Sequence, residues 1–117
     1  MIINKTKNSN IALKYKICNN FFSQSKGLMF SRPKVLIFDF KKEKKISLHM
    51  LFVFYPIYVF FLNNNKEVVE QKKMNPFTFY KSRKQSRFII EIPSRHFDKN
   101  SIDTGDKMEF RLTKFIK

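Results

Sequence analysis

The segment Ile57–Leu62, with the sequence IYVFFL, decides the fold because apolar side chains occupy nearly every position along it. Successive side chains of a β-strand point to opposite faces, so a strand that is apolar on both faces belongs in the interior of a sheet. Three asparagines follow at positions 63–65, and asparagine readily adopts the left-handed conformations of tight turns. The segment Glu67–Lys72 then completes a predicted β-hairpin.

Shorter segments on both sides of this hairpin predict further strands. These strands are expected at residues 11–17, 35–40, 46–54, 87–92 and 107–112. In several of them apolar and polar residues alternate, as in a strand with one face exposed to water. Pro56 and Pro93 interrupt the pattern where a strand is expected to end.

Helix signals are few. A short helix is expected at 21–30, where Ser23 can cap the first turn, and a second short helical piece is expected at 95–103. The stretch 73–85 is expected to be a loop or an edge strand. Because strands and helices do not alternate, the predicted fold class is mainly β: a compact antiparallel β-sandwich or barrel of about seven strands with one or two short helices.

The length and composition predict a single folded domain. With 117 residues, the chain can bury roughly two-thirds of the surface that it exposes when unfolded. A hydrophobic content of 43%, with 15 phenylalanines, excludes intrinsic disorder. Residues 1–10 are polar and are expected to form a flexible N-terminal segment, which leaves residues 11–117 for the β-rich domain.

The chain carries a formal net charge of +15, from 24 lysines and arginines against 9 carboxylates. Such an excess suggests a polyanionic partner, because neutralising phosphates releases condensed counterions. However, only five of the basic residues are arginine, the residue that binds phosphate and guanine through two hydrogen bonds. A composition rich in lysine, asparagine, isoleucine and phenylalanine also gives a basic surface without a specific partner, so both interpretations stay open.

Nothing in the sequence predicts secretion or a membrane span. The first ten residues contain no apolar stretch typical of a signal peptide. The single Cys18 cannot form an internal disulfide, which suits a reducing compartment. The apolar run Leu48–Leu62 is shorter than the roughly 20 residues that a membrane helix needs, and Pro56 interrupts it. We therefore expect a cytoplasmic protein without membrane insertion.

Three motifs, in order along the chain, resemble a known family. They are Gly27–Phe30 (GLMF), Ser47–Ile57 (SLHMLFVFYPI) and Ile90–Pro93 (IEIP), the last followed by a GDK turn at 105–107. In this combination the chain is similar to the family called domain of unknown function 192, in an archaeal-type branch. The resemblance covers roughly residues 11–112 and implies a compact β-rich domain with a short helix, but no established activity.

The sequence carries no recognisable catalytic device. Metal sites need several ligands at compatible spacing, and Cys18, His49 and His96 are isolated along the chain. A dyad of Cys18 with either histidine would require the fold to join them. With only two glycines, the chain has no glycine-rich phosphate loop. We therefore expect no cofactor and no bound metal, and we predict a non-enzymatic binding or accessory module.

Two candidate sites follow from the residues. The first is a basic aromatic edge that would engage RNA or single-stranded DNA, with bases stacked on aromatic rings and cations following the phosphates. It comprises Lys72, Lys73, Phe77, Phe79, Tyr80, Lys81, Arg83, Lys84 and Arg87. The alternative interpretation is that these cations only protect an exposed sheet edge against aggregation.

The second candidate site is a pocket for a small ligand or a partner peptide. Its expected residues are His49, Met50, Glu91, Gly105 and Asp106. His49 also fits a structural histidine within the core strand. The two sites should differ in shape, because exposed aromatic and cationic side chains coincide on a ridge for nucleic acid and around a concavity for a small ligand.

Overall fold

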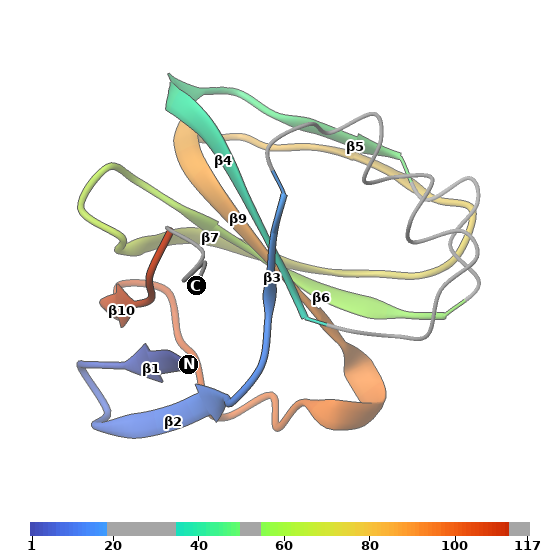
Figure 1. The fold of residues 1–117 in the computed structure, drawn as a ribbon. Helices are drawn as coiled ribbons and strands as arrows, with labels where there is room; N and C mark the ends of the chain where they lie inside the picture. The colour runs from blue at the N-terminus through green and yellow to red at the C-terminus, as the bar shows by residue number, and fades with distance from the viewer. Residues whose placement is uncertain (19–34, 50–54, 113–117) are drawn as a thin grey trace, which may run out of the picture.

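The computed structural model describes residues 1–18, 35–49 and 55–112. Within them the chain forms ten β-strands and one turn of 3-10 helix (Figure 1). These elements are β1 (Ile2–Asn4), β2 (Ser9–Ala12), β3 (Lys16–Cys18), β4 (Leu36–Lys44), β5 (Ser47–His49), β6 (Ile57–Leu62), β7 (Val68–Met74), β8 (Phe79–Lys81), β9 (Ser86–Pro93), η1 (Ser94–His96) and β10 (Met108–Glu109). The predicted mainly-β fold class is confirmed.

A five-stranded sheet forms the centre of the molecule, with the strand order β3-β4-β9-β6-β7. Neighbouring strands are antiparallel except for β3 and β4, which run parallel. Two smaller sheets accompany it, the three-stranded β10-β1-β2 and the pair β5-β8. Figure 1 shows β1, β2 and β10 gathered on one side of the central sheet and β5 on the other, so the arrangement is that of a layered sandwich.

Each face of the central sheet packs against one of the smaller sheets. Val59 and Phe61 of β6 belong to one hydrophobic cluster, which includes Leu48 of β5. Phe60, between them, belongs to the other cluster, which includes Ile2 of β1. We call the two faces the β5 side and the β1 side. All five side chains are buried, so β6 is an interior strand, as its sequence predicts.

The N-terminal residues are part of this packing. The sequence predicts a flexible segment over residues 1–10, whereas the structure places Ile2–Asn4 in β1, with both ends of the strand buried. The Nδ2 group of Asn4 donates a hydrogen bond of 2.7 Å to the carboxylate of Asp106. Asn4, which resembles a loop residue in the sequence, is thus buried and bonded to a turn 102 positions away.

The strand predicted at 11–17 is divided between two sheets. β2 ends at Ala12, Leu13 is 73% exposed, and β3 begins at Lys16. Here the chain leaves its pairing with β1 and joins the parallel edge of the central sheet. One alternating pattern therefore supplies two short strands, which is one reason why the described residues hold ten strands where about seven are expected.

Other expected elements can also be located. The hairpin of β6 and β7 is confirmed. The stretch 73–85 contains the short strand β8, and the piece expected to be helical at 95–103 contains only the end of η1. The helix expected at 21–30 and the end of the strand expected at 46–54 lie outside the described residues.

A largely buried ion pair ties β4 to β9. The guanidinium of Arg87 donates to both carboxylate oxygens of Asp39, at 2.9 and 3.2 Å, and the Asp39 side chain is 3% exposed. The backbone N–H of Lys41 donates to the same carboxylate at 2.8 Å. Burial alone would raise the pKa of Asp39, but the hydrogen bonds and charges of Arg87 and Lys41 outweigh it and lower that pKa.

Replacing Arg87 by glutamine should destabilise the protein by roughly 2–4 kcal/mol at pH 7, because the buried Asp39 would lose the guanidinium that donates to both of its oxygens and keep only the exposed Lys41 as a cation nearby. The pKa of Asp39 is lower in the folded chain than in the unfolded chain, so this stabilisation exists above about pH 4 and is lost as the pH falls further. Urea unfolding at pH 7 and pH 3 should therefore show a smaller difference between variant and wild type at the lower pH.

The matched control is Arg95→Gln, which removes the same charge from an exposed side chain. It should change the free energy of unfolding by less than about 0.5 kcal/mol. Equal losses in the two arginine variants would contradict a structural role for the buried pair.

Candidate functional site

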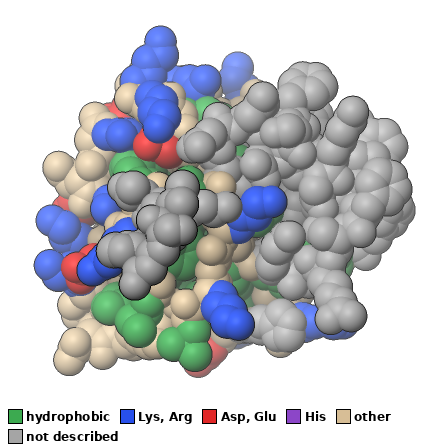
Figure 2. Space-filling view, viewed as in Figure 1, with side chains coloured by type: hydrophobic (Ala, Val, Ile, Leu, Met, Phe, Trp, Pro, Cys, Tyr) green, Lys and Arg blue, Asp and Glu red, His purple; other side chains and the backbone are tan. Residues whose placement is uncertain are grey.

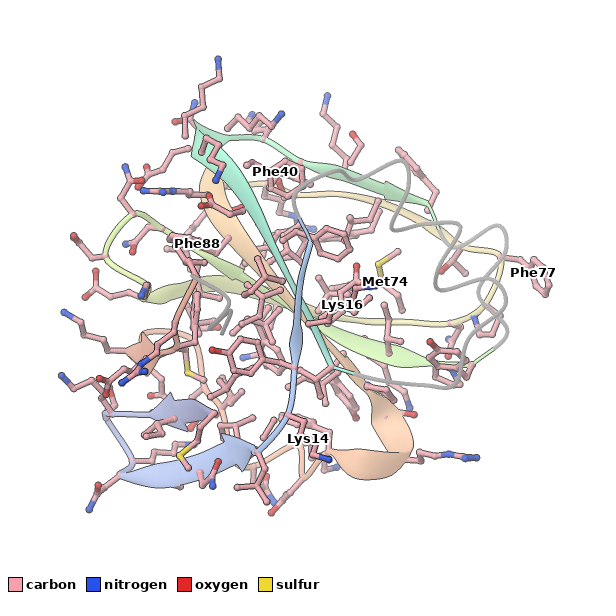
Figure 3. All side chains as sticks on the ribbon, viewed as in Figure 1. Lys14, Lys16, Phe40, Met74, Phe77 and Phe88 are labelled. Carbon is pink, nitrogen blue, oxygen red and sulfur yellow. The ribbon has the colours of Figure 1, made fainter. Side chains whose placement is uncertain are left out.

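Exposed aromatic and basic side chains alternate along the segment from β7 to the residues just after β8, a region that we call the β7–β8 corner. Phe77 is 60% exposed and Phe79 is 59% exposed. Figure 3 shows the Phe77 side chain pointing away from the body of the molecule. The members of the corner are Lys72, Lys73, Phe77, Phe79, Lys81, Arg83 and Lys84, all with exposed side chains.

The turn that carries Phe77 holds it in an unusual backbone conformation. Phe77 has a φ of +63° and follows Pro76. Proline followed by a residue with positive φ is the arrangement of a type II turn, whose second central position normally holds glycine or asparagine. The hydroxyl of Thr78 donates to the carbonyl of Asn75 at 2.6 Å. A large aromatic residue at such a position is strained, and strain of this kind clusters at functional sites.

Glu70 of β7 anchors the corner through hydrogen bonds. Its carboxylate accepts from the Tyr80 hydroxyl and from the backbone N–H groups of Arg83 and Lys84, the latter two at 2.9 and 3.0 Å. The hydrogen bond to Glu70, together with burial, raises the pKa of the Tyr80 phenol. The Tyr80 ring also packs against Phe61, with 6.0 Å between ring centroids. Tyr80 therefore positions β8 against the core.

Several of the cations expected at the basic aromatic edge contact aromatic rings. The Nζ atom of Lys72 lies 5.4 Å from the ring centroid of Tyr80, and that of Lys73 lies 5.7 Å from the ring centroid of Tyr58. Arg87 belongs to the buried ion pair. Of the nine residues expected at this edge, the structure leaves seven at the exposed corner and turns Tyr80 and Arg87 inward.

Positive charge is not confined to the corner. Figure 2 shows lysine and arginine side chains around much of the rim of the face that it presents. The segment from β4 to β5 carries four lysines of its own, at positions 41, 42, 44 and 45. Among the described residues, the exposed aromatic rings are those of Phe77 and Phe79, so the corner combines cations with rings.

The structure separates the residues expected to form a ligand pocket. Glu91 lies on the β5 side of the central sheet, because Ile89, two positions earlier on β9, packs in that cluster. The N–H of Gly105 instead donates at 2.7 Å to the carbonyl of Val68, which packs on the β1 side. Glu91 and the turn at 105–106 therefore occupy different faces of the central sheet.

Asp106 is engaged in structural contacts. Its carboxylate accepts from Asn4 at 2.7 Å and from the backbone N–H of Asp103 at 2.9 Å, and the Nζ atom of Lys7 lies 3.7 Å away. Burial would raise the pKa of Asp106, but these contacts outweigh it and lower that pKa. Gly105, with a φ of +99°, supplies the left-handed conformation that the turn requires. The turn thus joins the N-terminal strand to the fold.

Glu91 is buried, and its Oε1 atom has no hydrogen-bond partner. It lies two positions before the end of β9, paired with Leu36 on one side and Val59 on the other. The hydroxyl of Tyr55 is also buried without a partner. Burial raises the pKa of Glu91 to about 8, so the carboxyl is mostly protonated at neutral pH. Burial and the charge of Glu91 both raise the pKa of Tyr55, so the two groups interact; we call them the Glu91–Tyr55 pair.

The sequence points to Glu91 as a candidate site residue but not to Tyr55. A signal was present, because Tyr55 stands directly before Pro56 at the end of an apolar run, and buried tyrosine hydroxyls usually find a partner. Of the other residues expected at the pocket, His49 ends β5 but its side chain is not described, and Met50 lies outside the described residues.

Two negative findings apply to the part of the chain that the structure describes. No three histidine, cysteine or carboxylate side chains gather there as a metal site would require. No helix in those residues is long and apolar enough to span a membrane.

The sequence as a whole matches a known family. The model of domain of unknown function 192, described as an uncharacterised ACR, matches residues 2–110. The chain belongs to this family. The match includes both β1 and β10. The N-terminal strand β1, which lies before the range 11–112 over which the three motifs resemble the family, is therefore part of the family's domain.

Relatives in the family match this chain over nearly its whole length. A UPF0127 protein of Pyrococcus furiosus is 37% identical over 112 residues, which cover 93% of this chain and 97% of that protein. A UPF0127 protein of Thermococcus sibiricus is 34% identical over 117 residues, which cover 96% of this chain and 75% of that protein. Both relatives are archaeal, as the resemblance to an archaeal-type branch implies.

Solved structures share the fold. A protein of Sinorhizobium meliloti with a provisional assignment as a transcription regulator superposes with a TM-score of 0.77 at 17% identity, over 92% of this chain and 88% of that one. A protein of unknown function from Novosphingobium aromaticivorans superposes with a TM-score of 0.73 at 18% identity, over 93% and 81%. At these identities the similarity shows the fold alone, and the family description assigns no activity.

Replacing Glu91 by glutamine should stabilise the protein, and the gain should grow as the pH rises from 5 to 8. The pKa of Glu91 is higher in the folded chain, so the folded chain keeps a proton that the unfolded chain releases, and wild-type stability falls as the pH rises through this range. At pH 7 this loss amounts to about 3 kcal/mol, which sets the upper limit of the gain.

Thermal unfolding at a series of pH values measures this gain. Glu109→Gln, which removes a carboxylate from an exposed side chain, is the matched control and should show no such trend. A gain that does not change with pH would contradict a buried, protonated Glu91.

Proposed function

We propose that this domain is a non-enzymatic binding module whose β7–β8 corner binds single-stranded nucleic acid. The observation that carries the proposal is the pair of exposed rings, Phe77 and Phe79, with exposed basic side chains before and after them along the chain. Proteins that bind single strands without sequence preference combine aromatic stacking platforms with cations that follow the phosphate backbone.

The shape of the corner supports a strand as the ligand. Phe77 projects from a turn (Figure 3), and on β8 the exposed Phe79 and Lys81 alternate with the inward-facing Tyr80. Rings and charges are thus presented together on a projecting feature. This arrangement is the one expected for nucleic acid rather than for a small ligand in a concavity.

Edge protection alone does not account for these residues. β7 is an edge strand of the central sheet, and lysines such as Lys72 and Lys73 protect such an edge from pairing with another chain. Exposed aromatic rings have the opposite effect, because they add apolar surface that promotes association. Phe77 and Phe79 therefore favour a binding role over a protective one.

The corner is also prepared for binding before a ligand arrives. Glu70 holds the backbone at Arg83 and Lys84, and the Thr78 hydroxyl bonds across the turn at Phe77. A surface that is already ordered loses less conformational entropy on binding, so more of the contact energy appears as affinity.

Fluorescence anisotropy with labelled single-stranded DNA and RNA, at several salt concentrations, tests the proposal. If the corner neutralises about four phosphates, the log–log slope of affinity against salt should be close to −3. A corner variant should lose most of this slope, and a control variant should lose much less. The corner variant carries glutamine in place of Lys72, Lys81, Arg83 and Lys84, and the control variant carries glutamine in place of Lys41, Lys42, Lys44 and Lys45. Equal losses would mean diffuse attraction, and absence of binding at low salt would also refute the proposal.

Two substitutions of Phe77 separate stacking from backbone strain. Phe77→Ala and Phe77→Gly should both weaken binding by about 1–3 kcal/mol with little change in the salt slope, because stacking releases no counterions. Only glycine relieves the positive φ, so Phe77→Gly should be more stable than Phe77→Ala by about 1 kcal/mol. Anisotropy and urea unfolding measure the two effects, and unchanged affinity in both variants would exclude Phe77 as a stacking platform.

A further inference from the structure

Three hydrogen-bond donors of the β7–β8 corner converge on one carboxylate. The backbone N–H of Arg83 donates to Oε1 and Oε2 of Glu70, at 2.9 and 3.2 Å, and the backbone N–H of Lys84 donates to Oε1 at 3.0 Å. The Tyr80 hydroxyl also donates to Oε2. Successive backbone N–H groups that point at one anion form a nest, an arrangement that also binds phosphate. We call these three donors the corner nest.

The corner nest lies at the surface of the molecule, among cations. The side chains of Arg83 and Lys84 are exposed, and that of Glu70 is half-buried. Lys72 is exposed as well, and its Nζ atom lies 5.4 Å from the ring centroid of Tyr80. In the part of the chain that the structure describes, no lysine or arginine side chain forms an ion pair with Glu70. The cations beside the nest therefore keep their charge available for an anionic ligand.

The loop that supplies the nest is also held by contacts other than Glu70. The backbone N–H of Ser82 donates to the carbonyl of Ile46 at 2.8 Å. The buried Ser82 hydroxyl accepts from the N–H of Ile46 at 2.8 Å and donates to the carbonyl of Lys84 at 3.0 Å. These bonds keep the loop in place when the carboxylate leaves the nest. A half-buried glutamate side chain can make that move by rotating about its own bonds into water.

We infer that Glu70 is a placeholder for phosphate: its carboxylate fills the corner nest in the free protein, and a phosphate group of the ligand takes its place. The identity of that ligand, a single strand, rests on the proposed function. Phosphate oxygens accept the same three hydrogen bonds, so the exchange leaves no donor unpaired. Glu70 thereby keeps the nest ordered and also lowers the affinity for the strand, because phosphate enters only when the carboxylate has left.

Glu70→Ala empties the nest and tests the exchange. If the carboxylate fills the nest for about 90% of the time, its removal should raise the affinity for labelled oligothymidylate about tenfold, measured by fluorescence anisotropy. The matched control is Glu43→Ala. Glu43 is also half-buried between lysines and accepts from the backbone N–H of Asn64 at 2.8 Å, but it lies outside the corner. An equal gain in the control would show a general effect of charge and would overturn the inference.

The amide proton signals of Arg83 and Lys84 report the occupant of the nest directly. Hydrogen bonds to an anion are short and strong and move an amide proton downfield, so both signals should move upfield in Glu70→Ala. Adding oligothymidylate should return them downfield. Inorganic phosphate, at constant ionic strength, should do the same with a Kd on the order of 10 mM, and it should bind the wild type about tenfold more weakly.

The possible failures are distinguishable. Signals that stay upfield with both probes would show that phosphate does not enter the nest, even where the strand binds elsewhere on the corner. A lower affinity in Glu70→Ala would make Glu70 an anchor of the corner rather than a placeholder. If no variant binds the strand, the proposed function fails, and the response to inorganic phosphate still decides whether the nest is a phosphate site. If Glu70→Ala does not fold, Glu70→Gln, which leaves a neutral occupant, should give a smaller gain in the same direction.

Discussion

In β9, Ile89 packs on the β5 side of the central sheet and Ile90 packs on the β1 side, and β6 repeats this arrangement. A sheet whose interior strands are apolar on both faces must have each face covered by other elements, because water would otherwise contact apolar side chains. In the described residues the chain does this with two small sheets, β5-β8 and β10-β1-β2. Strands of two to four residues are too short to be stable alone, so each cover depends on the central sheet as much as the sheet depends on it.

The corner and the buried Glu91 both belong to the β5 side. The pairing of β5 with β8 brings the chain back over the central sheet, and the turn that precedes β8 presents Phe77. The same side of the sheet buries Glu91. Its side chain points to the same face as that of Ile89, two positions earlier on an otherwise apolar strand, and Ile89 packs in the cluster on the β5 side. The corner and the buried pair are therefore products of one packing solution, although their chemistry is unrelated.

The acidic residues explain how this surface becomes so basic. Asp39, Glu70 and Asp106 are each bonded to groups of the chain itself, and Glu91 is buried. Carboxylates that satisfy backbone N–H groups and internal cations contribute less to the outer surface than their number implies. Lysines meanwhile stay at the rim, where their heads remain hydrated.

Local patterns were sufficient to predict the hairpin of β6 and β7 and the strand at 87–92. Contacts between distant positions were not predictable in this way. The inward turn of Arg87 depends on Asp39, 48 positions earlier, and the burial of Asn4 depends on Asp106, 102 positions later. Strand alternation likewise shows which residues of β9 share a face with Glu91. It does not show on which face of the central sheet the turn at 105–106 packs.

The position of β1 sets an order of events during folding. Ile3 pairs with Glu109, so the cluster on the β1 side cannot close until nearly the whole described chain is available. The strands β6, β7 and β9, by contrast, lie within residues 57–93 and can pair with one another early. During synthesis β1 thus waits for β10, and the dominance of long-range pairings makes this a slow-folding topology.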